Sequence, residues 1–201
     1  MSRQDTKALA HQETKALARE LKTQGTILGG FVATIWVLEF VDVFLGGALN
    51  RYGILPRNLI GLRGILFAPF LHGNFAHLIA NTIPFLTLGW FVMLRETSDF
   101  FVVTGITMLV SGLGVWLIGS SGLHIGASGV VFGYLGFLLA RGYFERNIPS
   151  ILLSVIVGFL YGGAIWGVLP TQPGVSWEGH LFGFIGGVIA ARFLSQRKQV
   201  S

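Results

Sequence analysis

Residues 125–140 read IGASGVVFGYLGFLLA, an apolar and glycine-rich run that begins with Gly126-Ala127-Ser128-Gly129. As a helix, at ~1.5 Å per residue, this run reaches roughly 24 Å, short of a ~30 Å hydrocarbon core. Membrane helices that pack against other helices, rather than face lipid, are typically rich in glycine and other small residues. The sequence therefore predicts a buried membrane helix whose polar start, at Ser128, lies below the membrane surface.

A second run of the same kind, residues 181–194, follows Gly179-His180. Gly183 and Gly187 are four residues apart in it, as Gly129 and Gly133 are in the first run. Glycines four apart lie on one face of a helix and allow two backbones to approach closely. The two stripes predict that these helices pack together and bring Ser128 to His180.

The composition indicates a polytopic membrane protein. Of 201 residues, 52% are hydrophobic and only 11% are charged, whereas a soluble domain carries roughly 25% charged residues. The absence of cysteine excludes a disulfide, a thiolate nucleophile and a cysteine-based zinc site. The net charge of +5 does not indicate a nucleic-acid partner, because the positive residues lie at the ends of apolar runs, where they orient membrane helices. The expected partner is the lipid bilayer.

The predicted fold is an all-α polytopic membrane protein with a six-transmembrane-helix bundle. Its six apolar runs are residues 27–49, 78–94, 100–118, 125–140, 151–169 and 181–194. Residues 1–26 are polar and favour helix, and they are interpreted as a cytosolic N-terminal extension. Residues 27–194 form the predicted six-span domain. Residues 195–201 are a short cytosolic tail.

The distribution of positive charge predicts the orientation of the bundle. Six spans place both termini on one side of the membrane. If that side is the cytoplasm, the outer segments contain only Arg51, Arg57 and Arg63 of the 14 Lys and Arg residues, as the positive-inside rule requires. The second, fourth and sixth spans then run inward from the outer face, which brings three separated polar motifs to one depth. These motifs contain Ser128, His180 and the pair His77 and Asn81.

A serine and a histidine at one depth are the two groups of an acyl-transfer dyad. The histidine takes the hydroxyl proton and returns it to the leaving amine. Glu178 is two residues from His180 and points elsewhere on a helix, so a dyad is favoured over a triad.

Acyl transfer also needs donors for the developing oxyanion. Ser128 lies at a helix start, where backbone N–H groups are unpaired. His77 and Asn81 are four residues apart and share one helical face, and both are able to donate hydrogen bonds. His72, just before that helix, is expected to hold the loop or to join the site.

The motifs described above, together with His72-Gly73-Asn74-Phe75-Ala76-His77 before Asn81, resemble those of rhomboid intramembrane serine proteases over residues 27–194. The resemblance implies Ser128 as nucleophile and His180 as base. It implies His77, Asn81 and the Ser128 backbone N–H at the oxyanion, with Gly126, Gly129, Gly183 and Gly187 in support. It also implies cleavage of single-span membrane substrates near the outer end of their helix, with no cofactor and no metal. The expected location is the bacterial inner membrane.

Two positions depart from the pattern of that family. Family members often carry Trp-Arg in the first outer loop, where this chain reads Leu62-Arg63-Gly64. A tyrosine that packs on the histidine often follows the serine by four residues. Here Phe132 supports the site instead, and it keeps the ring without the hydroxyl.

Other interpretations remain open at this level. Ser128 alone would more often bond a backbone carbonyl, and His77 and Asn81 alone would bond a neighbouring helix. The alternative functions are an inactive homologue that binds membrane helices, or a small transporter. Glu39 and Asp42 are expected to bond the outer loop or a neighbouring helix, since buried charge is costly.

Two further histidines, His11 and His124, are expected at the surface. The oligomeric state is left open.

Overall fold

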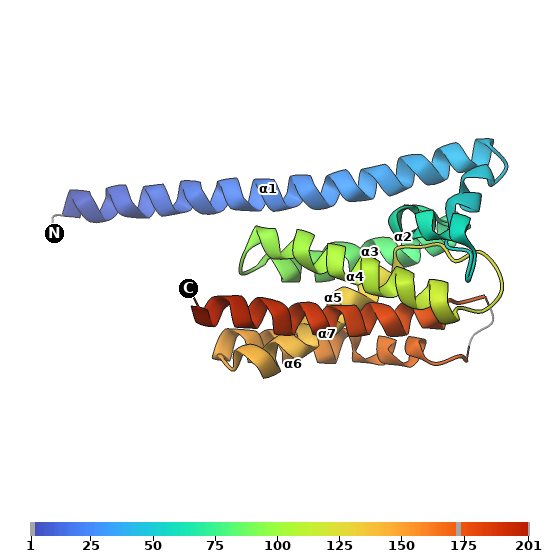
Figure 1. Cartoon of the computed structure of the whole chain (residues 1–201). Coiled ribbons are helices and arrows are strands. Elements are labelled where there is room, and N and C mark those ends of the chain that lie inside the picture. Colours follow the sequence, from blue (N-terminus) through green and yellow to red (C-terminus); the bar gives the residue numbers. More distant parts are fainter. Residues whose placement is uncertain (1–2, 172–173, 201) are drawn as a thin grey trace.

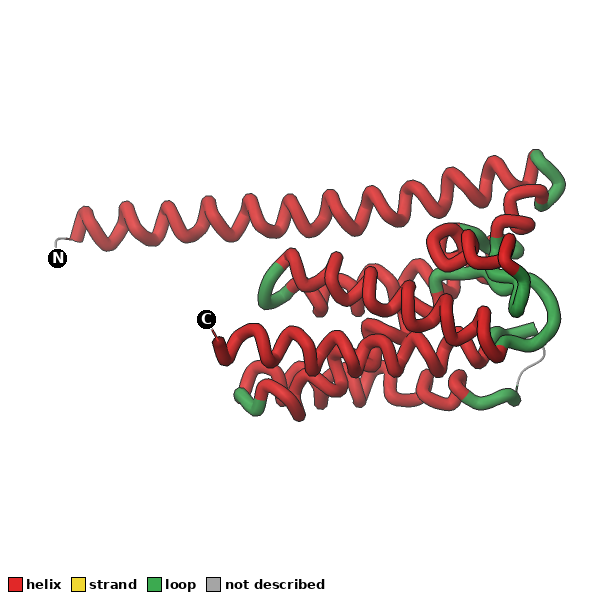
Figure 2. The backbone as a smooth tube through the Cα atoms, in the orientation of Figure 1, coloured by secondary structure: helices red, strands yellow, loops and turns green. Residues whose placement is uncertain are grey.

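The computed structural model describes residues 3–171 and 174–200, which form only helices and connecting loops (Figure 2). The α-helices are α1 (Arg3–Phe44), α2 (Gly64–Phe67), α3 (Phe75–Met93), α4 (Thr97–Ile118), α5 (Ser128–Glu145), α6 (Ile148–Tyr161) and α7 (Trp177–Val200). The 3-10 helices are η1 (Ala48–Tyr52), η2 (Leu59–Arg63), η3 (Ala68–Phe70) and η4 (Gly162–Val168). The predicted all-α class is confirmed.

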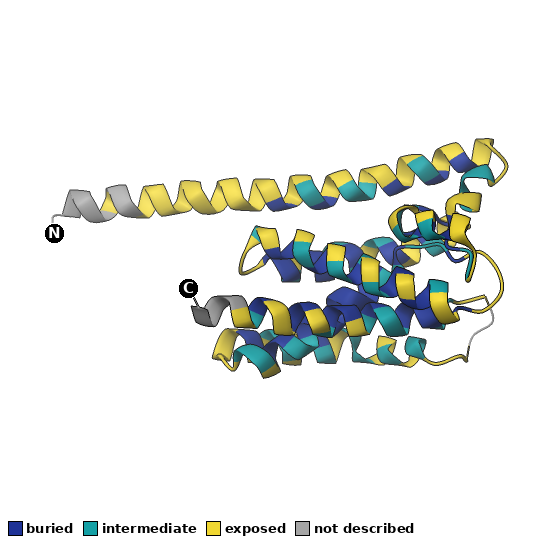
Figure 3. Cartoon of the chain, in the orientation of Figure 1, coloured by how far each residue is buried: buried dark blue, intermediate teal, exposed yellow. Residues whose placement is uncertain are grey.

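Six of these α-helices are long and lie alongside one another as a bundle, with both chain ends at the same end (Figure 1). The opposite end, which carries the short helices from η1 to η3 and the loops that lead into α5 and α7, is called the distal end below. α5 packs against α3, α4, α6 and α7, and most extensively against α7. Most of its side chains are therefore buried, while α1 is largely exposed (Figure 3).

By length and apolar composition, four helical segments of the described residues are able to cross a membrane. They are Ala10–Phe44, Phe75–Met93, Thr97–Ile118 and Ile148–Val168, the last being α6 with η4. The protein is thus an integral membrane protein. The two long helices outside this group, α5 and α7, arise from the two short glycine-rich runs. Since α5 is enclosed by other helices, its own hydropathy need not match that of a lipid-facing span.

The predicted N-terminal extension is continuous with the first span. α1 runs from Arg3 to Phe44 without a break at residue 26, and residues 10–23 are exposed. The helix meets the bundle at Gln24, which is buried and accepts a hydrogen bond of 3.0 Å from the indole N–H of Trp90. At the other end of the chain, α7 continues as helix through residues 195–200 of the predicted tail.

Close backbone contact between α5 and α7 depends on the glycine stripes. A Cβ added to Gly183 would collide with the backbone of Gly129, and one added to Gly187 would collide with the backbone of Gly133. Small residues at such crossings let helix axes approach more closely than side chains permit. The crossing sets the first turns of α5 and α7 side by side at the distal end.

The segment between α1 and α3, called the covering segment below, lies at the distal end and packs against α1 and α4. The carboxylate of Asp42, near the end of α1, accepts a hydrogen bond of 2.6 Å from the backbone N–H of Leu49. This agrees with the expectation that Asp42 bonds the loop. Farther along, Ile54 and His124 exchange two backbone hydrogen bonds of 2.9 Å each. The covering segment is therefore attached to the loop that leads into α5.

Candidate active site

A cavity of about 850 Å³ at the distal end contains the predicted site. Its wall includes Ser128 of α5, His180 of α7, and His77 and Asn81 of α3. Segments widely separated in the sequence thus supply four polar side chains to one space. A cavity of this volume is large enough for a small ligand or for a short length of polypeptide.

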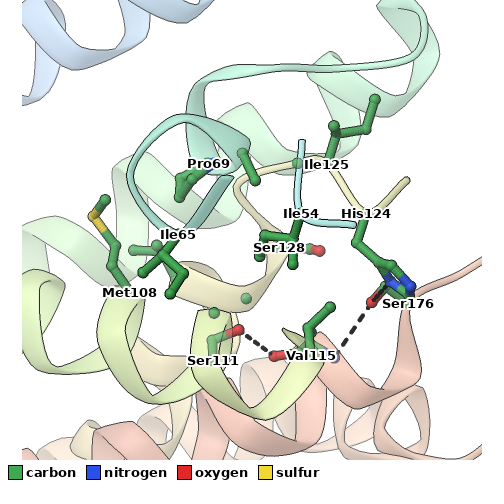
Figure 4. Close-up of a pocket in the computed structure, with 16 residues that line it drawn as sticks. Ile54, Ile65, Pro69, Met108, Ser111, Val115, His124, Ile125, Ser128 and Ser176 are labelled. Carbon is green, nitrogen blue, oxygen red and sulfur yellow. Dashed lines mark hydrogen bonds between the residues drawn. The ribbon is translucent and has the colours of Figure 1, made fainter. Parts of the chain in front are cut away.

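Ser128 is the first residue of α5. The first N–H groups of any helix lack intrahelical acceptors. Ala127, the residue before Ser128, provides no side-chain cap for them. The turn before it requires glycine, because Gly126 has φ +117° and a Cβ there would lie 2.6 Å from Cε1 of His77. Gly126 therefore lets the turn pass close to the His77 ring. Figure 4 shows Ser128 beside the smaller neighbouring pocket that Gly126 and Gly129 also line.

His180 lies in the first turn of α7 and is held by two contacts. Its Nδ1 lies 2.9 Å from the backbone carbonyl oxygen of Gly167 in η4. Because a carbonyl only accepts hydrogen bonds, Nδ1 carries the proton and Nε2 of the neutral ring is left as an acceptor. The ring also stacks on Phe132, with centroids 4.1 Å apart and planes 6° apart. The imidazole is thereby fixed in both orientation and tautomer.

Within the described residues, no hydrogen bond joins the side chains of Ser128 and His180. The two side chains share the cavity wall, and their helices meet at the Gly129–Gly183 crossing. Catalytic hydrogen bonds are often long in unliganded enzymes and shorten when substrate binds. The arrangement is compatible with a serine–histidine pair.

The two α3 side chains lie one helical turn apart. Asn74 caps the helix by accepting a hydrogen bond of 2.9 Å from the backbone N–H of His77. The amide nitrogen of Asn81 donates to the carbonyl of His77 across 3.1 Å. An amide nitrogen carries two hydrogens, so one remains for a group in the cavity.

His72 holds the serine loop and lies outside the wall of the large cavity. The ring is 1% exposed, and its Nε2 accepts a hydrogen bond of 3.5 Å from the N–H of Ala127, the residue before Ser128. The ring also packs edge-on against His77, with centroids 5.1 Å apart. His72 thus contacts the loop before Ser128, and its part in the site stays a prediction.

One prediction about histidine is wrong. His124 was expected at the surface, but only 9% of it is exposed and both ring nitrogens are hydrogen-bonded. Gly167 is also absent from the predicted residues, because a backbone carbonyl leaves no mark in a sequence. Glu178 lies in the first turn of α7, and its carboxylate accepts a hydrogen bond of 2.8 Å from the N–H of Ser120. It is therefore engaged with the loop before α5.

The sequence profile of the Rhomboid domain matches residues 61–197 of this chain. The chain belongs to the rhomboid family. An uncharacterized protein of Mycobacterium tuberculosis (strain H37Rv) is 45% identical over 180 residues, which cover 85% of this chain and 75% of that protein. Rhomboid protease GluP of Bacillus subtilis is 31% identical over 182 residues, 84% of this chain and 34% of GluP. RHOMBOID-like protein 5 of Arabidopsis thaliana is 31% identical over 172 residues, 75% of this chain and 51% of that protein.

Membership of the rhomboid family implies intramembrane serine protease activity on membrane-protein substrates within the bilayer. The matched residues include all of α3 to α6, together with Ser128 and His180. The site described above therefore lies within the part of the chain that defines the family.

Proposed function

We propose that this protein is a serine endopeptidase in which Ser128 is the nucleophile and His180 is the general base. The observation that carries the proposal is the shared cavity, which Ser128, His180, His77 and Asn81 reach from three different helices. Any one of these residues has an ordinary structural explanation. Their convergence on one space large enough for a peptide fits a catalytic site better.

The reaction would begin when Nε2 of His180 takes the Ser128 hydroxyl proton as Oγ attacks the scissile carbonyl carbon. The tetrahedral intermediate carries a negative oxygen. His77, the free N–H of Asn81 and the Ser128 backbone N–H are the proposed donors to this oxygen. His180 then gives the proton to the leaving amine, the C–N bond breaks and an acyl-enzyme remains. A water molecule, activated by the same histidine, hydrolyses the ester.

The Gly167 carbonyl takes the orienting part that a carboxylate plays in a triad. It holds Nδ1–H and so keeps Nε2 free to accept the serine proton. A carbonyl is a weaker partner for an imidazolium than a carboxylate, because hydrogen bonds to charged groups are the stronger ones. The Phe132 stack supports the ring from the side of α5.

We further propose the six-span topology, in which α5 and α7 cross the membrane as buried helices and both termini lie in the cytoplasm. Residues 1–26 are then a cytosolic extension of the first helix. The cavity at the distal end lies toward the outer face, so single-span membrane substrates would be cleaved near the outer end of their helix. The mycobacterial and Bacillus relatives favour a bacterial inner membrane.

Labelling of the purified protein with a serine-directed phosphonate, beside cleavage of a single-span substrate in detergent, tests the assignment. Ser128→Ala should abolish both, and His180→Ala should abolish cleavage while the protein still accumulates. The double variant should be no worse than either single variant, because the pair acts as a unit. Substantial cleavage by Ser128→Ala would exclude Ser128 as the nucleophile. A parent that binds a membrane helix but neither labels nor cleaves would be an inactive homologue.

A further inference from the structure

His124 connects the loop before Ser128 to the helix that carries His180. Its Nδ1 lies 2.6 Å from the hydroxyl oxygen of Ser176, and its Nε2 lies 2.9 Å from the carbonyl oxygen of Ser120. Figure 4 shows the His124 ring beside Ser176, and Ser128 lines the same small pocket. His124 and Ser176 also line the large cavity that contains the proposed dyad. This ring therefore lies between the two segments that bear the reacting groups.

The directions of these hydrogen bonds follow from the acceptors. Because the Ser120 carbonyl only accepts, Nε2 of the neutral His124 ring carries the proton and Nδ1 is an acceptor. The Ser176 hydroxyl then donates to Nδ1. The same hydroxyl oxygen accepts a 3.4 Å hydrogen bond from the N–H of Gly179. Each donor in these three hydrogen bonds has an acceptor, so the His124 ring and the Ser176 hydroxyl are both held in place.

Ser176 immediately precedes α7 and acts as its N-cap. Side-chain acceptance from the N–H three residues later is the usual capping pattern, and the carbonyl of Ser176 accepts from the N–H of His180 across 3.2 Å. His180 thus lies in the turn that Ser176 caps. A second link joins the same two segments, from the N–H of Ser120 to the carboxylate of Glu178.

On the other side, His124 is four residues before Ser128 and is held by its own backbone. It exchanges two hydrogen bonds with Ile54 in the covering segment, so its main chain has little freedom. A displacement of the α7 cap relative to this loop would change the separation of Ser128 and His180. Catalysis is sensitive to such changes, since ~1 Å of misplacement can cost ~10²-fold in rate.

We propose that His124 is a positioning residue that sets the separation of Ser128 and His180 by binding the N-cap of α7. This inference rests on the proposed function of the dyad. His124 does not touch the reacting atoms in this scheme. It acts through Ser176, and its contribution should appear in the reactivity of Ser128 rather than in the affinity for substrate.

The test compares three substitutions of His124 that differ in which ring nitrogen they imitate. The side-chain oxygen of Asn lies near the place of Nδ1 and is able to accept from Ser176. The side chain of Gln reaches toward the place of Nε2 and the Ser120 carbonyl, and Phe keeps a ring without either contact. The measurements are the phosphonate labelling rate of Ser128, kcat and KM for a single-span substrate, and the melting temperature in detergent.

We expect His124→Phe and His124→Gln to lower the labelling rate and kcat by about tenfold to a hundredfold, with KM changed by less than about twofold. His124→Asn should stay within about threefold of the parent, because it preserves the link to Ser176. Ser176→Ala should resemble His124→Phe. The double variant His124→Phe/Ser176→Ala should be no slower than the slower of its two single variants, since the effects of substituting residues in contact are not additive.

Ser154→Ala is the matched control. The Ser154 hydroxyl links α6 to α5 by donating to the carbonyl of Leu138 across 2.6 Å, and Ser154 is not part of the cavity wall. This variant should melt earlier than the parent but label at the parent rate well below its melting temperature.

Labelling and cleavage at parent rates by His124→Phe would overturn the inference and leave the proposed function intact. Equal losses in His124→Asn and His124→Gln, in proportion to lowered melting temperatures, would also overturn it. Failure of the parent to label would refute the proposed function, and the inference with it.

Discussion

Nδ1 of His180 and the backbone carbonyl of Gly167 are joined by a hydrogen bond of 2.9 Å that links α7 to the last turn of η4. The final carbonyls of a helix lack intrahelical donors, so the contact satisfies one of them. It also fixes the histidine without a carboxylate. The Gly167 position is correspondingly tight, because a Cβ there would lie 2.8 Å from Cζ of Phe132 and 3.3 Å from Nδ1 of His180.

The first prediction concerns Gly167. Gly167→Ala should lower kcat by about tenfold to a hundredfold, because its methyl group would displace the two stacked rings by a substantial fraction of an ångström. Gly163→Ala, in the same 3-10 helix, is the control, since no atom lies within 4 Å of the added Cβ. Steady-state cleavage assays of both variants check the expectation. Equal rates for the two variants would show that the Gly167 contact does not orient the base.

The second prediction concerns the crossing of α5 and α7. Gly183→Ala should lower both activity and thermal stability, because its Cβ would collide with the Gly129 backbone and overpacking typically costs about 1–3 kcal/mol. Gly105→Ala in α4 has open space around the added Cβ and should behave like the parent. Melting curves in detergent are measured beside cleavage. A Gly183→Ala protein that melts and cleaves like the parent would show that α5 and α7 do not approach each other closely at Gly129 and Gly183.

The third prediction concerns the oxyanion donors. Loss of one such donor costs up to ~10³-fold in rate in soluble serine proteases. Because three donors are proposed here, Asn81→Ala should lower kcat by about tenfold or more with a smaller change in KM. Thr82→Val is the control, because the Thr82 hydroxyl bonds the Leu78 carbonyl and lies outside the cavity wall. A raised KM with an unchanged kcat would instead show that Asn81 binds substrate and does not stabilise the oxyanion.

The fourth prediction concerns orientation in the membrane. Reporters fused after Arg95, Arg146 and Ser201 should read as cytoplasmic, and reporters fused after Arg57, Gly122 and Gly174 should read as external. The physical reason is the concentration of positive charge on one set of connecting segments. Alkaline phosphatase and fluorescent-protein fusions distinguish the two sides. A cytoplasmic signal after Gly122 would place the cavity at the wrong face.

The sequence was informative wherever the membrane imposes a cost. Polar side chains at the starts of apolar helices are costly in a membrane, so the sequence alone indicates Ser128, His180, His77 and Asn81 as candidate site residues. The glycines at 129, 133, 183 and 187 were identifiable for a related reason, because helix pairs in lipid depend on close backbone approach. The apolar runs themselves fixed the helical class.

Two other features were decided only by the tertiary structure. The partner of His124 is Ser176, 52 positions later, and the partner of His180 is a carbonyl 13 positions earlier. Polar residues are common in loops between apolar runs, so nothing in the sequence singles out His124 or Ser176, and every residue has a backbone carbonyl. The sequence by itself determined that this is a helical membrane protein and which polar side chains lie within its apolar segments. The contacts that orient His180 and attach the loop before Ser128 to α7 depend on how the chain packs across these distances, which no local pattern of residues encodes.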